Sequence, residues 1–84
     1  MRPEPEHFEE FVNWLREESG LSESTQKSVR KRARLAHSIC GIEGSDRYVE
    51  RLEAKSKYKK LAEGVKPNVK YAVRVYFRFL EQSR

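Results

Sequence analysis

The segment from about Pro67 to Gln82 constrains the fold most, because its apolar residues cover most of the surface of a helix. These residues are Val69, Ala72, Val73, Val75, Tyr76, Phe77, Phe79 and Leu80. Positions three or four apart share one face of a helix, and Pro67 suits a first helical turn, where its missing N–H costs nothing. A helix with so wide an apolar arc is surrounded by protein on most sides. We therefore expect this helix at the centre of a helical bundle.

Helical spacing of apolar residues recurs in the rest of the chain, and no strand-like alternation of useful length appears. We expect helices at about residues 6–19, 23–40 and 46–54, and a short helix or a continuation of the third helix within 55–64. Glycines lie at the boundaries, and Ser22 or Ser24 can cap the second helix. The predicted fold class is all-α, a compact bundle of four to five helices.

The length of 84 residues predicts one domain. Residues 1–5 are expected to form a disordered lead, because Pro3 and Pro5 disfavour helix there, and residues 6–84 a single helical domain. The only cysteine, Cys40, excludes a disulfide within the chain. No apolar run approaches the roughly 20 residues of a membrane span. We therefore expect a cytoplasmic protein with no membrane partner.

The charge of the chain is divided unevenly along its length. Residues 1–20 contain two basic and six acidic residues, a net charge of −4, whereas residues 21–84 contain sixteen basic and seven acidic residues, a net charge of +9. The first segment should repel phosphate and the remainder should attract it. The first helix is therefore expected to face away from an anionic partner.

Two rows of cations follow the second and the last predicted helices. The first row is Lys27, Arg30, Lys31 and Arg34, and the second is Lys66, Lys70, Arg74 and Arg78. Like charges at helical steps repel one another and cost helix stability, and few carboxylates lie at the matching positions in the sequence. We expect both rows to share a single outer surface that binds nucleic acid.

Catalytic chemistry has little support in the sequence. His7 and His37 are thirty positions apart and lack a metal-binding spacing, and Cys40 is predicted to lie on the packing face of the second helix. The four glycines fall at helix boundaries rather than in a phosphate-binding loop. We therefore expect no enzyme activity from this chain, no cofactor and no metal site. Core packing is the expected role of most aromatic residues, and Tyr71 alone is predicted to reach DNA.

Two stretches resemble the N-terminal core-binding domain of the tyrosine recombinases, the phage-integrase family. Residues 8–16 read FEEFVNWLR and residues 20–25 read GLSEST, similar to an F-x-x-F/Y-x-x-W/Y-L helix followed by a G-L-S-x-x-T turn. The segments 57–61 and 69–80 are similar to the last helix of such domains. The resemblance covers nearly the whole chain, although Val29 stands where an aromatic residue is frequent in the family.

The resemblance implies a SAM-like bundle of four or five helices that clamps one side of double-stranded DNA. It implies that the second and fourth helices face the major groove, with Thr25 added to the first row and Asn68 to the second. The predicted DNA-binding residues are therefore Thr25, Lys27, Arg30, Lys31, Arg34, Lys66, Asn68, Lys70, Arg74 and Arg78. The arginine, histidine and tyrosine of the family's catalytic domain have no counterpart here. The implied partners are a C-terminal catalytic domain beyond Arg84 or other recombinase protomers, unless the chain is a stand-alone relative.

Two other functions are compatible with the same residues. A helical protein-interaction module would use the cationic rows to dock an acidic partner, including the acidic first helix of another copy. A small helix-turn-helix regulator would bind DNA as a dimer through one recognition helix. In that case, mutation of only one row would remove nearly all binding.

Overall fold

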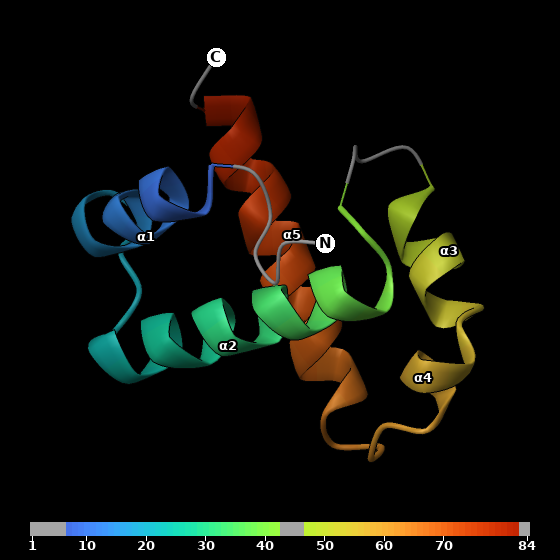
Figure 1. Ribbon diagram of the computed structural model, residues 1–84. Coiled ribbons are helices and arrows are strands. Elements are labelled where there is room, and N and C mark those ends of the chain that lie inside the picture. The colour runs from blue at the N-terminus through green and yellow to red at the C-terminus, as the bar shows by residue number, and fades with distance from the viewer. Residues whose placement is uncertain (1–6, 43–46, 83–84) are drawn as a thin grey trace.

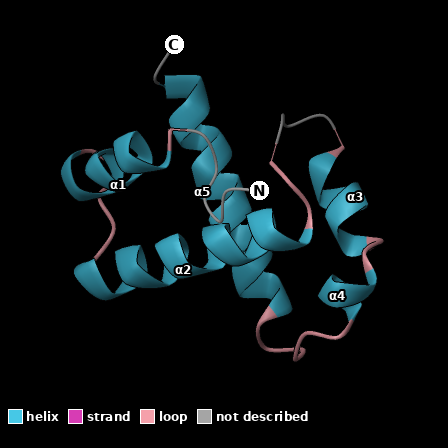
Figure 2. Cartoon of the chain, viewed as in Figure 1, coloured by secondary structure: helices cyan, strands magenta, loops and turns pink. Residues whose placement is uncertain are grey.

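Helices account for all the regular structure in residues 7–42 and 47–82, the parts of the chain that the computed structural model describes. The helices are α1 (Phe8–Glu17), α2 (Glu23–Ile39), α3 (Tyr48–Glu53), α4 (Ser56–Lys59) and α5 (Lys66–Gln82). Figure 2 shows these helices joined by loops, with no strand in the described ranges. The Cα radius of gyration, 12.1 Å, is that of a compact domain of this length. The predicted fold class, an all-α bundle of four to five helices, is confirmed.

Most helix boundaries lie close to their predicted positions. Ser22 is the N-cap of α2, and its Oγ accepts a hydrogen bond from the backbone N–H of Thr25 at 3.3 Å. The chain reverses after α1 through Gly20, whose φ of +75° is readily available only to glycine. Within 55–64 the structure has a separate short helix, α4, rather than a continuation of α3. The expected lead at residues 1–5 and the residues before α3, 43–46, lie outside the described parts of the chain.

The last helix, α5, is central as predicted. Figure 1 shows it crossing behind α2, with α1 on one side and α3 and α4 on the other. Its buried residues are Val69, Ala72, Val73, Val75, Tyr76 and Phe79. They divide between two apolar clusters, one shared with α1 and α2 and the other with α2, α3 and α4. This division fixes the position of α2 across α5, because α2 contributes small buried side chains to both clusters.

Aromatic rings join α1 to the C-terminal half of α5. The ring of Phe11 is fully buried and lies 4.9 Å from the Tyr76 ring in an edge-on arrangement, and 5.4 Å from the Phe79 ring. Trp14 donates from Nε1 to the Gln82 Oε1 at 3.0 Å. Edge-on and offset aromatic pairs contribute about 0.5–1.5 kcal/mol each beyond the area they bury. The F-x-x-F-x-x-W-L pattern of α1 is therefore the residue set that attaches α1 to α5.

Tyr48 attaches α3 to the end of α2. Its side chain is fully buried, and its hydroxyl donates to the backbone oxygens of Ala36 and Cys40. Burial, and secondarily the neighbouring Cys40, raises the pKa of the Tyr48 hydroxyl, which Arg51 opposes only in part. Cys40 is itself buried beside this bond, as its place on the packing face predicts. In the described residues, no helix has the length and apolarity needed to cross a membrane.

Candidate nucleic-acid interface

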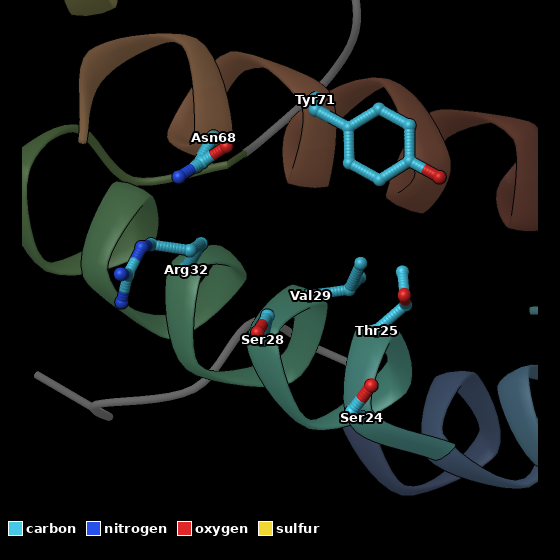
Figure 3. A pocket seen from close by; sticks show the side chains of 7 residues that line it. All are labelled: Ser24, Thr25, Ser28, Val29, Arg32, Asn68 and Tyr71. Atoms are coloured by element: carbon cyan, nitrogen blue, oxygen red, sulfur yellow. The ribbon is translucent and has the colours of Figure 1, made fainter. Parts of the chain in front are cut away.

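A groove lies between α2 and the N-terminal half of α5 on one side of the molecule. Figure 3 shows the side chains that line it, which come from both helices. They are Ser24, Thr25, Ser28, Val29 and Arg32 of α2, and Asn68 and Tyr71 of α5. The groove encloses a volume of about 300 Å³ and is open to solvent. Its lining is rich in hydroxyl, amide and guanidinium groups, which suit hydrogen bonding to a polar ligand.

Helix geometry explains why these residues meet. The Ser22 cap starts α2 at Glu23, so Thr25, Ser28 and Arg32 follow one another along one side at steps of three and four. On α5, Asn68 and Tyr71 are likewise three positions apart. Asn68 donates from Nδ2 to the Gly64 backbone oxygen at 3.1 Å, which orients its amide at the start of α5. The predicted contact residues Thr25 and Asn68 therefore line the same groove.

Arg32 is a groove residue that the cationic rows did not include. Its Nε is buried and has no hydrogen-bond partner among the described residues. A buried donor without a partner costs about 1–3 kcal/mol, and an anionic or carbonyl oxygen in the groove would recover part of that cost. Arg32 lies on a different side of α2 from the row of Lys27 and Lys31. Only its step of four from Ser28, in a run of hydroxyl residues, could have indicated its position.

Tyr71 is the large apolar side chain most clearly available at this surface. It is 45% exposed, whereas the other tyrosines of the chain are buried. Its ring forms one wall of the groove opposite Thr25 (Figure 3). An exposed aromatic ring can stack on a nucleic-acid base or pack on a sugar. The prediction that Tyr71 lies outside the core is confirmed, and contact with DNA stays a prediction.

The first cationic row separates into two parts. Lys27 and Lys31 are exposed, lie three positions after Ser24 and Ser28, and make no hydrogen bond or ion pair to another described residue. Arg30 and Arg34 turn toward α1, where they line a second depression with Val12 and Arg16. The Arg34 guanidinium lies 5.0 Å from the centre of the Phe8 ring. Lys27 and Lys31 are therefore each one helical step from a lining residue of the groove, whereas Arg30 and Arg34 line the depression beside α1.

The second row is mostly occupied by contacts within the protein. Lys66 pairs with Glu63 at 3.0 Å and Lys70 pairs with Glu53 at 3.3 Å, both between Nζ and a carboxylate oxygen. Arg78 donates from Nη2 to the Ser19 backbone oxygen at 3.3 Å, and its guanidinium lies 5.3 Å from the Trp14 ring. Arg74 is exposed, three positions after Tyr71, and pairs with no other described residue.

The contacts of the described residues do not bring the two rows together as one outer surface, and that expectation stays a prediction. Lys31 lies roughly 160° around α2 from Val29, and Arg74 lies roughly 160° around α5 from both Ala72 and Tyr76. Val29, Ala72 and Tyr76 belong to one buried cluster. Because the two helices pack through these apolar faces, Lys31 and Arg74 lie on the outer sides of α2 and α5, away from the contact between the helices. Lys31 lies three positions after Ser28 and Arg74 three positions after Tyr71, so each is beside a lining residue of the groove on its own helix.

The described residues include no group of three His, Cys, Asp or Glu side chains that could hold a metal ion. The chain matches no family model, no curated protein and no solved structure significantly. The fold and the groove together define a small all-α domain with a polar groove between two crossing helices. Its function must be inferred from that surface.

Proposed function

We propose that the chain is a DNA-binding domain that holds double-stranded DNA over the groove between α2 and α5. The observation on which this rests is that Thr25 and Asn68, from helices far apart in the sequence, line one groove with Arg32. The resemblance of the α1 segment and the following turn to the tyrosine recombinases supports a more specific assignment. The domain would then be the core-binding domain of a recombinase or integrase, or a stand-alone relative of one, and would not cut DNA by itself.

Cations beside the groove supply the affinity in this proposal. Lys27 and Lys31 on α2 and Arg74 on α5 are exposed and unneutralised by any described residue. Each phosphate that they neutralise releases a condensed counterion, so binding weakens with salt at a slope of about −0.9 per contact. Lys66, Lys70 and Arg78 contribute less, because their charges already have partners within the domain.

Groups within the groove supply sequence preference. Asn68 can present its amide to the edge of adenine, and the Arg32 guanidinium can donate two hydrogen bonds to guanine. Thr25 and its neighbouring hydroxyls can contact either bases or phosphates. The exposed α1 carboxylates Glu9, Glu10 and Glu17 would repel DNA from the opposite side of the domain. The duplex is therefore oriented as well as held.

A charge-reversal experiment tests the proposal. The double variant Lys31→Glu/Arg74→Glu should lose duplex binding in a fluorescence-anisotropy titration at low salt, and its circular dichroism should remain that of the wild type. The matched control is Arg16→Glu/Arg47→Glu, which makes the same change in net charge at exposed positions outside the groove. Binding by the groove variant equal to that of the control would contradict the proposal.

A protein-interaction module is the second candidate, and one observation favours it. Arg16, Arg30 and Arg34 converge on the half-buried Val12 in the depression between α1 and α2, a surface suited to an acidic peptide. This function predicts concentration-dependent self-association or peptide binding, with no duplex binding at low salt. A helix-turn-helix regulator predicts that substitutions in only one of the two helices remove nearly all DNA binding, whereas a groove formed by two helices predicts that α2 and α5 substitutions both weaken it.

A further inference from the structure

We infer that the exposed lysines around α4 form a second, sequence-independent contact to the phosphates that flank the groove. This α4 lysine cluster consists of Lys55, Lys57, Lys59 and Lys60, four cations within six residues. The inference rests on the proposed function, because its ligand is the same duplex. It extends the footprint to a part of the chain that neither cationic row includes.

The α4 lysine cluster is left unneutralised by the arrangement of the neighbouring carboxylates. All four lysines are exposed, and none has a hydrogen bond or ion pair through its side chain to another described residue. The acidic residues on either side of the segment, Glu53 and Glu63, are paired with Lys70 and Lys66 of α5. Glu53 and Glu63 are the carboxylates that could have paired with the α4 lysines, and both pair with lysines of α5 instead.

Tyr58 holds this cluster in a fixed position. It is the buried residue of α4, its hydroxyl donates to the Lys66 backbone oxygen at 3.5 Å, and the Lys66 Nζ lies 6.0 Å from its ring. A four-residue helix has no stability of its own, so this anchor determines where the lysines lie. Figure 1 shows α4 beside the first turns of α5. The cluster therefore lies beside the N-terminal turns of α5, the part of that helix from which Asn68 and Tyr71 line the groove.

Phosphate is the ligand that best fits four lysines without accompanying polar groups. The α4 lysines at steps of three and four repel one another, and a helix as short as α4 gains no stability from them. Lysine is a compact, strongly hydrated charge without the fork geometry that reads a base or clamps a carboxylate in two places. Such side chains contribute affinity without sequence information when they face a DNA backbone.

The salt dependence of binding distinguishes the α4 lysine cluster from the residues in the groove. The variant Lys55→Gln/Lys57→Gln/Lys59→Gln/Lys60→Gln should lower the slope of log affinity against log salt by about 0.9 for each phosphate that is no longer neutralised. We expect a decrease of about two to three and a half, the same for two duplexes of unrelated sequence. The variant retains Tyr58, and circular dichroism should confirm that it folds. Replacement of the same four lysines by arginine should preserve the wild-type slope.

A smaller variant controls for net charge. Lys57→Gln/Lys59→Gln should lower the slope more than Arg16→Gln/Arg47→Gln, which removes the same charge elsewhere. Equal slopes for these two variants would overturn the inference. A wild-type slope in the fourfold variant would overturn it as well, and would leave the groove proposal standing if Lys31→Glu/Arg74→Glu loses binding. Failure of the wild type to bind any duplex at low salt would overturn both. If the fourfold variant lost as much affinity for polyglutamate as for duplex DNA, the assignment of the cluster to DNA would be overturned.

Discussion

Lys70 of α5 and Glu53 at the end of α3 form an ion pair between two helices, with 3.3 Å between Nζ and Oε2. Both side chains are about one-third to one-half exposed, so the pair should add only about 0.2–1 kcal/mol to the free energy of unfolding. Its larger consequence is electrostatic, because it cancels a cation of the predicted DNA-binding row. We therefore expect Lys70→Gln to weaken duplex binding less than Arg74→Gln.

Anisotropy titrations of Lys70→Gln, Arg74→Gln and Glu53→Gln at one salt concentration measure this difference. Glu53→Gln should strengthen binding modestly, since it removes a negative charge and leaves Lys70 unpaired. Arg74→Gln serves as the comparison because it lies one helical turn after Lys70 and has no described partner. A larger decrease in affinity for Lys70→Gln than for Arg74→Gln would show that the ion pair opens when DNA binds.

Asn68 is the groove residue best placed to give sequence preference. Its Nδ2 group donates to the Gly64 backbone oxygen, which fixes the amide while leaving Oδ1 available. Replacement by alanine should cost about 1–3 kcal/mol with a preferred duplex and much less with a scrambled one, because alanine cannot hydrogen-bond to a base while the phosphate-binding cations remain. Binding to a duplex selected from a random pool, compared with a scrambled control, measures the effect. An equal decrease in affinity for both duplexes would assign Asn68 to the phosphate backbone.

The sequence predicted the elements of the fold because local spacing determines them. The apolar arc of residues 69–80 correctly indicated a central helix, and the buried faces of α1 and α2 follow from the same periodicity. The turn at Gly20 and the cap at Ser22 are local as well, since each depends on the backbone of a few residues. These features need no knowledge of how the helices cross.

The candidate site was predicted only in part because it depends on how the helices pack. Periodicity shows that Lys31 shares a face with Lys27, but not that this face points away from α5. The pair of Lys70 and Glu53 joins residues in different helices, seventeen positions apart, so no helical step could indicate it. Arg32 was missed for the same reason: its significance comes from lying opposite Asn68, on another helix.

The cap of α2 gives a stability prediction that is independent of DNA. Ser22 Oγ accepts from the backbone N–H of Thr25 and satisfies one of the free donors at the start of the helix. Ser22→Ala should lower the free energy of unfolding by about 1 kcal/mol, and Ser22→Gly by only a few tenths. Urea denaturation followed by circular dichroism measures both. The control is Ser24→Ala, which should change stability by less than about 0.5 kcal/mol, and an equal effect of the two alanine variants would contradict the capping role.

Tyr48 should make the domain sensitive to alkaline pH. Burial raises the pKa of its hydroxyl above the value of about 10 that it has in the unfolded chain. The folded state therefore holds this proton more tightly than the unfolded state. The resulting stability is fully present below about pH 10 and is lost as the pH rises beyond it.

The variant Tyr48→Phe removes this titration. It should lower the free energy of unfolding by about 1–3 kcal/mol at neutral pH, because the buried Cys40 carbonyl loses a donor. Its stability should then decline less steeply than that of the wild type between about pH 9 and 11. Urea denaturation at a series of pH values measures both effects, and Tyr71→Phe, at an exposed position, should retain the wild-type decline. A decline of Tyr48→Phe parallel to that of the wild type would mean that Tyr48 does not couple folding to pH.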